Sequence, residues 1–484
     1  MKKILVIFNL VFFMLLLVSC NKNNEYTQLK VLSLNDLHGA ITESDDNYGM
    51  AGISWYVNQQ REVEGQAVLV LAAGDMFQGS AISNYSYGET VVELMNDVKF
   101  DAMTIGNHEF DWGLDEVLKY VDGDQSNYEA NFPFLACNLL EKSTNERPDN
   151  VDAYTVVDFE QFQVGIIGYI GMGIESDISA SKVADYYFDN PIKYIEELSK
   201  ELRNDLGCEL VIVMGHDDNS SMQGLIAGLS GDSAVDMIVN GHSHSTYTRY
   251  ITNGNGVKIP VTQAGTAADA ITDTLFLYNK ESNAFDDGYA DTVDLCGLEI
   301  GIDENIKNKV DKMNEEIEPV MGEVLGVASR NVNRTSVGNW TADAIKSATN
   351  CDVSAINSGG IRSSAFPISE GTTITLAKMY EIMPFDNFIK VCELTGEELE
   401  YIIGRIHDVH FSSNVVVEGN TIYIDGEALV DDQIYTFACV DYLYDRDAEI
   451  YEAGENVQFT GILVRDIMVN ALKAETSQGK NWLE

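Results

Sequence analysis

Positive charge is scarce in this sequence. Its 484 residues carry 30 Lys and Arg against 77 Asp and Glu, a formal net charge of −47. Such a surface would repel the phosphates of a nucleic-acid polymer, so we expect no partner of that kind. It would also repel small anions, and a site for a phosphorylated substrate would therefore need metal ions and arginine close by. The charge favours solubility and says little about the fold.

Long apolar runs are missing beyond the first twenty residues, so we expect no membrane-spanning helix in the rest of the chain. A charged start and an apolar stretch over residues 4–18 lead to Leu17-Val18-Ser19-Cys20. This segment resembles a bacterial lipoprotein signal, which implies cleavage before Cys20 and a lipid on its sulfur. An ordinary secretory signal or a membrane anchor is the alternative. We expect an exported, outward-facing protein held at the cell membrane by its lipid alone.

Closely spaced cysteines are also absent. The cysteines beyond Cys20 are scattered and form no Cys-x-x-Cys pair, which argues against a zinc–thiolate site. Their even number would permit disulfides in an exported chain. Several lie inside apolar runs, however, and this favours buried free thiols. The six residues are Cys137, Cys208, Cys296, Cys351, Cys392 and Cys439.

The sequence does contain a repeated pattern: a short apolar run, often a glycine, and then Asp, Asn or His. Such runs predict buried strands, and in open α/β sheets ligands gather at the carboxyl ends of strands. Residues 29–34 precede Asp36 and His38, 67–73 precede Asp75, 101–105 precede Asn107 and His108, 209–214 precede His216, and 236–240 precede His242 and His244. Helical spacing predicts helices at 90–96, 191–206, 301–324 and 338–349, and a capping box at Thr395-x-x-Glu398 begins a further helix.

Five of the seven histidines follow these strand ends. Each could be a stray loop or core histidine, but that explanation must then hold five times. Asp36 and His38 are two residues apart, so in extended chain both would point to one side. Asp, Asn and His side chains suit divalent Zn, Mn, Fe or Co. Six or seven ligands are too many for one tetrahedral ion, and we infer two ions that share Asp75. His407 and His410 are expected at the surface.

These motifs are similar, in order and spacing, to those of the calcineurin-like metallophosphoesterases. The branch formed by bacterial and animal 5′-nucleotidases is the most similar, through residues 71–79 and 101–113. The motifs are Asp36-x-His38, Gly74-Asp75, Gly106-Asn107-His108-Glu109, Gly215-His216 and Gly241-His242-x-His244.

The resemblance implies an α/β protein. It would have an N-terminal four-layer α/β/β/α metallophosphoesterase sandwich and a smaller α/β C-terminal nucleotidase domain. A chain of this length is expected to hold two or three domains. The expected order is a signal peptide at 1–20, a tether at 21–29, the metallophosphoesterase domain at 30–300, a linker helix at 301–326 and the substrate-binding domain at 327–484.

The resemblance also implies the metal ligands. Zn or Mn is expected at both positions, and two such ions can activate water and neutralise charge on a phosphoryl group. Some relatives have Gln at the position of His244. The first ion would lie on Asp36, His38, Asp75 and His244, and the second on Asp75, Asn107, His216 and His242.

His108 and Asp111 match the catalytic pair of the family. In that interpretation His108 stabilises the transition state or protonates the leaving oxygen, and Asp111 orients His108 and raises its basicity. His108 directly follows the ligand Asn107, so it can reach the substrate without binding an ion. The three-residue separation can be closed by a turn into a hydrogen bond.

The second half of the chain contains a weaker motif, Asn357-Ser358-Gly359-Gly360-Ile361-Arg362, after a predicted strand at 353–356. Glycine lets the backbone approach a ligand closely, and the arginine fork suits phosphate or carboxylate. The motif resembles that of the nucleotidase C-terminal domain. Asn357 would then touch the base or sugar, Gly360 would lie close to the substrate, and Arg362 would bind the phosphate.

Two aromatic residues match the clamp that holds the base in this family, Phe385 and Tyr442. Phe385 could instead be a core residue after a proline turn. The Gly-Gly-Asp-Gly stretch of the family is missing from residues 439–447, so the aspartate that would hold the ribose has no clean match. Arg330 and Arg334 both lie near the place of a further substrate arginine, and neither aligns cleanly. Base and sugar selectivity therefore stay open.

The expected activity is hydrolysis of nucleoside 5′-monophosphates to nucleoside and phosphate. A broader phosphoesterase that takes 2′,3′-cyclic nucleotides, 3′-nucleotides or UDP-sugars is the alternative. A non-catalytic binding lipoprotein is a more distant one, since it would not need a complete set of ligands. The ions belong to the first domain and the nucleoside to the second, so the two must face each other.

Overall fold

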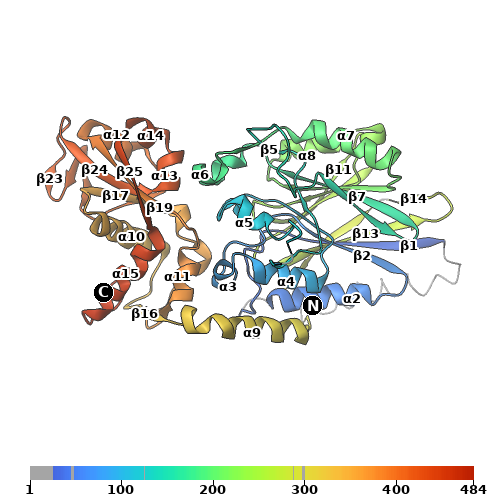
Figure 1. The fold of residues 1–484 in the computed structure, drawn as a ribbon, viewed down its shortest axis with the longest axis horizontal. Helices are drawn as coiled ribbons and strands as arrows, with labels where there is room; N and C mark the ends of the chain where they lie inside the picture. The colour runs from blue at the N-terminus through green and yellow to red at the C-terminus, as the bar shows by residue number, and fades with distance from the viewer. Residues whose placement is uncertain (1–24, 45–47, 125, 287, 297–299) are drawn as a thin grey trace.

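The computed structural model describes residues 25–44, 48–124, 126–286, 288–296 and 300–484. It consists of two domains connected by the long helix α9 (Glu304–Met321), which runs beneath both (Figure 1). The lipidation site expected at Cys20 lies outside the described residues. Within them, no helix is long and apolar enough to cross a membrane.

Two sheets form the centre of the N-terminal domain. The first has the order β14 (Ala284–Phe285), β13 (Ala270–Asn279), β1 (Tyr26–Leu34), β2 (Gln66–Ala72), β3 (Ala102–Thr104) and β4 (Phe134–Leu135), with β15 (Tyr289–Asp294) also on β13. The second has the order β11 (Thr246–Thr252), β12 (Lys258–Ala264), β10 (Met237–Asn240), β9 (Leu210–His216), β7 (Phe162–Ile170) and β6 (Tyr154–Phe159). Strands β1 to β4 pair in parallel, as do β7, β9, β10 and β12.

The two sheets pack face to face through one apolar cluster, to which Val31 and Leu71 contribute from the first sheet and Ile212 from the second. Helices cover both outer faces, because the strands of each sheet are apolar on both sides. On the first sheet these are α2 (Gly49–Arg61), α4 (Glu89–Val98), α5 (Leu114–Leu118) and α9. On the second they are α7 (Pro191–Asn204) and α8 (Ser220–Ala227). The expected four-layer α/β/β/α arrangement is confirmed.

The C-terminal domain is built on a smaller mixed sheet with the order β20 (Val409–Phe411), β17 (Val353–Asn357), β24 (Ile434–Val440), β19 (Phe388–Thr395) and β25 (Glu455–Leu463). The capping box of Thr395 and Glu398 is formed as predicted. The helices of this domain are α10 (Arg334–Thr349), α11 (Leu376–Ile382), α12 (Gly396–Arg405), α13 (Asp441–Arg446), α14 (Ala448–Ala453) and α15 (Val464–Ser477).

The two domains face each other where α11 approaches the short helix α3 (Ala81–Tyr85) and α13 approaches α6 (Ala180–Val183) (Figure 1). A buried hydrogen bond crosses this boundary, because the Asn84 side-chain amide donates to the Pro384 carbonyl at 3.1 Å. The carboxyl ends of the parallel strands in the first domain therefore open toward the second.

Three details differ from expectation. Strand β1 begins at Tyr26, so part of the expected tether is already in the first sheet, paired with β13. His410 is not a surface residue: it is half-buried on β20, and its ring contacts Ser358 and Asn339 at 3.1 Å each. Cys296 is exposed, whereas buried cysteines were expected; the other five scattered cysteines are buried, and no disulfide forms among the described residues, as predicted.

Candidate metal centre and active site

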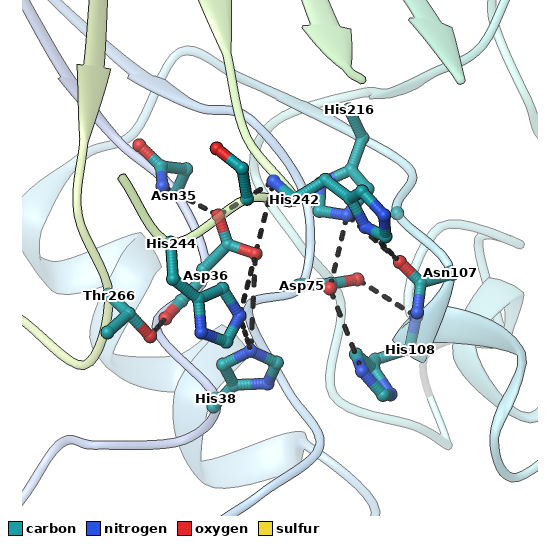
Figure 2. Close-up of polar contacts among 12 residues, drawn as sticks. Asn35, Asp36, His38, Asp75, Asn107, His108, His216, His242, His244 and Thr266 are labelled. Carbon is teal, nitrogen blue, oxygen red and sulfur yellow. Dashed lines mark hydrogen bonds and ion pairs between the residues drawn. The ribbon is translucent and has the colours of Figure 1, made fainter. Parts of the chain in front are cut away.

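The seven side chains expected to bind metal converge at the carboxyl ends of five parallel strands, β1, β2, β3, β9 and β10 (Figure 2). The Nε2 atoms of His38 and His244 lie 3.1 Å apart. His216 Nε2 lies 3.1 Å from Asp75 Oδ2 and also 3.1 Å from Asn107 Oδ1. The complete set is Asp36, His38, Asp75, Asn107, His216, His242 and His244.

Possible ligand atoms fall into groups that overlap at Asp75. One group holds Asp36, His38 and His244, and another holds Asp75, His216 and His242, with the atoms of each within 4.8 Å of one another. Asp75 also groups with His38 and His108, which places its carboxylate between the two sets. This is the position that a shared ligand must take.

The hydrogen bonds of two imidazoles fit a bound cation. His38 Nδ1 lies 2.9 Å from the Gln78 carbonyl, and His216 Nδ1 lies 2.8 Å from the Ala73 carbonyl. Because a carbonyl can only accept, each Nδ1 must carry a hydrogen, and in the neutral ring each Nε2 then offers its lone pair to the cluster. Carboxylate, amide and imidazole donors together suit a divalent ion of the Zn or Mn type.

Five of the seven residues have positive φ angles, in the left-handed region of backbone conformation. The φ angles are 49° for Asp36, 50° for His38, 55° for Asp75, 78° for His242 and 54° for His244. The expectation of extended chain at Asp36-x-His38 was therefore wrong. Strand β1 ends at Leu34, and the next residues turn so that their N–H groups reach the loop after β2, with the His38 N–H donating to the Asp75 carbonyl at 3.0 Å.

Glycine in two of the motifs provides space for the ligands. A β-carbon at Gly106 would lie 2.3 Å from Asp75 Oδ1, and one at Gly74 would lie 2.5 Å from His216 Nδ1. Both distances are far below van der Waals contact, so a side chain at either position would push a ligand out of place. The glycines of the motifs are thus a packing requirement of the centre.

Glu109 holds the loops that carry the metal candidates, a role that the sequence did not lead us to expect. Its fully buried carboxylate accepts the N–H groups of Asp75 and Met76 at 2.9 Å each and of Gly106 at 2.7 Å. Two ligand-bearing loops are thereby fixed to one side chain. Burial and the neighbouring charge of Asp75 raise the pKa of Glu109 to about 7. Its place in the Gly106–Glu109 motif was the available signal.

The expected catalytic pair is formed. His108 Nδ1 lies 2.7 Å from Asp111 Oδ2, and the His108 backbone N–H donates to Asp75 Oδ1 at 2.9 Å. Burial lowers the pKa of His108, but the carboxylates of Asp111 and Asp75 outweigh burial and raise it above its usual value. The ring is therefore suited to carry a proton near neutral pH.

Opposite charges also dominate the deepest part of the cluster. Burial lowers the pKa of His216, but the carboxylates of Asp75 and Asp36 outweigh this effect and raise it to about 10. Burial raises the pKa of Asp36 itself to about 6. An ion that binds through His216 Nε2 must displace the proton held there, so metal affinity should rise with pH.

A cavity of about 560 Å³ lies between the domains and reaches the metal cluster. The Arg362 guanidinium carbon is 4.8 Å from the centre of the Phe385 ring, and the ring of His108 stacks against the same phenyl at 5.7 Å. Burial lowers the pKa of Arg362. Among the residues that line the cavity are the expected Asn357, Gly360, Arg362, Phe385 and Tyr442.

The other two expected substrate residues do not line the cavity. Arg334 donates from Nε to the Ile361 carbonyl at 2.6 Å and from its guanidinium to the Ser358 carbonyl. It thus holds the loop that carries Arg362. Arg330 is exposed, away from the cavity.

Several lining residues have no counterpart in the sequence reasoning. They come from turns, from the short helix α6, from the first residues of β19 and α13, and from β25, and tertiary contacts bring them to the cavity. From the first domain these are Asp177, Ser179, Ser181 and Lys182, and from the second Phe388, Asp441 and Phe459. Asp386 and Asn387, which belong to the motif of Phe385, line the cavity as well.

Comparison with known proteins agrees with this architecture. The calcineurin-like phosphoesterase family matches residues 29–246, and the family of the 5′-nucleotidase C-terminal domain matches residues 316–416. The chain is 28% identical over 434 residues to Endonuclease YhcR of Bacillus subtilis, covering 83% of this chain but only 35% of that protein. It is 25% identical over 435 residues to the snake venom 5′-nucleotidase of Crotalus adamanteus, covering 79% of this chain and 70% of the venom protein.

The fold matches a solved structure over nearly its whole length. The crystal structure of the 5′-nucleotidase precursor from Thermus thermophilus superposes with a TM-score of 0.74 at 20% identity, over 93% of this chain and 96% of that one. Both domains and their order are therefore common to the two proteins. By its two matched domains and its fold, the chain belongs to the 5′-nucleotidase family, whose phosphoesterase domain implies divalent metal ions.

Proposed function

We propose that the protein is a metal-dependent phosphohydrolase that releases phosphate from nucleoside 5′-monophosphates. The observation that carries the proposal is the shared cavity, in which the metal cluster, the His108–Asp111 pair and Arg362 face one space. A phosphate held by Arg362 would lie beside the cluster, and the attached nucleoside would extend toward the aromatic residues of the second domain.

Two divalent ions, Zn or Mn, would be held by the seven converging residues. When bound, they would activate water and neutralise the charge that grows on the phosphoryl oxygens. Arg362 presents a planar fork for two phosphoryl oxygens. His108 donates a proton to the leaving oxygen, and Asp111 keeps the ring oriented and protonated. A protonated His108 and a cationic Arg362 also offset the substrate's own charge inside a very acidic protein.

The nucleoside would occupy the part of the cavity formed by the second domain. Phe385 and Tyr442 supply two aromatic side chains for a base, and Asn357 supplies an amide for the base or sugar. The carboxylate that holds the ribose in relatives has no clean match here. A broader substrate range that includes 2′,3′-cyclic nucleotides, 3′-nucleotides or UDP-sugars therefore remains the second candidate.

For the cellular setting we infer export and a lipid anchor at Cys20, on the strength of Leu17-Val18-Ser19-Cys20 alone. We infer nucleotides rather than nucleic-acid polymers as substrates, because a net charge of −47 repels a polyanion. The name of the Bacillus subtilis relative makes this second inference worth testing directly.

The test is a substrate panel in which the products are separated and identified by chromatography, with free phosphate measured beside them. Cleavage of cyclic AMP, UDP-glucose or DNA breaks a phosphodiester or pyrophosphate bond and by itself releases no phosphate. The panel contains AMP, 3′-AMP, 2′,3′-cyclic AMP, UDP-glucose and single-stranded DNA, each with added Zn²⁺ or Mn²⁺. The proposal expects AMP to be turned over fastest. Faster turnover of a cyclic nucleotide, 3′-AMP or UDP-glucose would select the broader phosphoesterase, and cleavage of DNA would overturn the inference about polymers.

The two-ion centre is tested in the same assay with Asp75→Asn, which removes the shared carboxylate. The matched control is Asp158→Asn, an exposed position on β6. We expect the first variant to lose AMP hydrolysis and the control to keep it. Full activity of Asp75→Asn would contradict the two-ion centre, and a metal-loaded wild type that converts none of the compounds to any product would favour a binding protein.

A further inference from the structure

The ring of His242 has a partner on each side. Its Nδ1 lies 3.0 Å from Asn107 Oδ1, on the side of the metal cluster (Figure 2). Its Nε2 lies 3.4 Å from Asp177 Oδ2. When Nδ1 offers its lone pair to a cation, Nε2 carries the hydrogen, and Asp177 is the carboxylate within ion-pair distance of that nitrogen. A histidine ligand that donates to a carboxylate through its second nitrogen is the usual way in which a protein fixes the orientation of such a ring.

Asp177 is unlike the other carboxylates of the site. The side chain is 46% exposed, whereas those of Asp36 and Asp75 are almost fully buried. It lies at the end of a single turn of 3₁₀ helix, η2 (Ile174–Asp177), and not at the end of a strand. Its position must therefore be determined by whatever holds that short segment.

The segment is held from both domains. Within the first domain, Ile174 and Ile178 are buried in the apolar core, and Glu175 accepts the Phe188 N–H at 2.8 Å. The other contacts come from the second domain. Arg446, at the end of α13, donates from Nε to the Ile178 carbonyl at 3.0 Å, and its terminal nitrogen also reaches the carbonyls of Glu175 and Ile178. The Tyr442 hydroxyl lies 3.4 Å from the Ser176 carbonyl. These contacts surround Asp177 in the sequence, and both side chains come from one helix of the C-terminal domain.

We propose that Asp177 is a positioning residue for His242, and that Arg446 sets the place of Asp177 from across the domain boundary. The second metal position would then be complete only when the C-terminal domain is docked. Tyr442, expected to hold the base, stands on the same helix as Arg446, so the nucleoside pocket and the second ion would share one support. The proposal builds on the proposed function, since it explains how the substrate domain acts on the metal centre.

The proposal would explain why residues 439–447 differ from the family pattern. The segment has no Gly-Gly-Asp-Gly stretch, and Arg446 stands within it. A guanidinium can bridge two carbonyls in a fixed geometry, which a lysine could not do. The chain thus has a connection between domains in the segment where the family pattern would place the Gly-Gly-Asp-Gly stretch.

The first test measures metal affinity without substrate. Mn²⁺ is titrated into metal-stripped full-length protein, and the affinities of the tighter and the weaker ion are recorded for wild type and Asp177→Ala. We expect the ion that uses His242 to bind about 10-fold or more weakly in the variant, as is typical for loss of such a carboxylate. The other ion should bind as in wild type. Asp185→Ala, an exposed aspartate nearby, is the control and should change neither affinity.

The role of Arg446 is tested with Arg446→Met, which keeps the apolar stem and removes the donors. It should weaken the same ion. In the double variant with Asp177→Ala it should add no further loss, because both changes would act through one carboxylate. Additive losses would overturn the role of Arg446. Wild-type affinity for both ions in Asp177→Ala would overturn the proposal as a whole.

Unfolding in chelator separates these effects from damage to the fold. All variants should unfold at the wild-type temperature, since Asp177 is half exposed and Arg446 is half-buried. Metal binding and the substrate panel test the positioning role and the proposed function separately. A wild type that hydrolyses AMP while Asp177→Ala binds Mn²⁺ normally would refute only the positioning role. A wild type without phosphatase activity, together with weakened Mn²⁺ binding in Asp177→Ala, would refute only the phosphatase.

Discussion

The substitution Glu109→Gln tests whether hydrogen bonds or burial has the larger effect on the ionised Glu109 carboxylate. Three backbone N–H groups stabilise the carboxylate, while burial and the charge of Asp75 disfavour it. The pKa of Glu109 is raised from 4.5 to about 7, so in the absence of cations the unfavourable effects prevail. Because one pKa unit corresponds to about 1.4 kcal/mol, ionisation costs the folded protein about 3 kcal/mol at most.

The sign of the pH dependence follows from this shift. The folded protein binds the proton of Glu109 more tightly than the unfolded chain does, so this residue makes the protein less stable as the pH rises from 4.5 through 7. Glutamine does not ionise and escapes that cost. In chelator at pH 8.5, Glu109→Gln should therefore unfold at a higher urea concentration than wild type, and at pH 5 the two should be nearly equal.

When metal is bound, the ionised Glu109 of wild type should be favoured over the glutamine of the variant. Cations beside Asp75 attract the negative charge of Glu109, so the same substitution should weaken Mn²⁺ binding and lower AMP hydrolysis. Urea unfolding of both proteins at both pH values, with chelator and with Mn²⁺, measures how the substitution changes the free energy of unfolding with and without metal. If Glu109→Gln were less stable than wild type in chelator at pH 8.5, the three hydrogen bonds would outweigh burial, and the reasoning about this carboxyl group would be refuted.

Two further changes probe the catalytic pair and the motif glycines. Asp111→Asn should lower the pKa of His108, so the alkaline limb of the pH–rate profile for AMP should move to lower pH, and an unchanged limb would contradict the role of His108 as the acid. Gly106→Ala should displace the Asp75 carboxylate and reduce bound Mn²⁺, as measured by metal analysis. Gly224→Ala, in the open on helix α8, is the control and should bind metal normally with equal or slightly higher stability.

Much of the fold could be predicted because its signals are local. Apolar runs that end in Gly and a polar residue correspond to β1, β2, β3, β9 and β10, and the parallel order of these strands brings their ends together. The seven metal candidates were found for the same reason. Each lies at or within a few residues of the carboxyl end of a strand, so the strand order places it near the others, although contacts such as those of Glu109 fix its final position.

The remainder of the site depends on contacts that no local pattern records. Asp177 and Lys182 reach the cavity from short segments, η2 and α6, that contact both domains and carry no clear pattern in the sequence. Arg334 carries the same charge as Arg362, yet only the structure distinguishes the residue that supports the loop from the residue that faces the cavity. The turn at Asp36 was misjudged because the alternation rule applies within a strand, and β1 has already ended.

The left-handed φ angles of five metal candidates have a consequence for evolution in the laboratory. At such positions Gly has no steric cost, whereas Asp, His and Asn tolerate left-handed angles better than other residues but still store some strain. A selection for heat resistance alone should accumulate Gly at these five sites and yield robust, inert proteins. Screens for hardier variants of this chain therefore have to score turnover in every round.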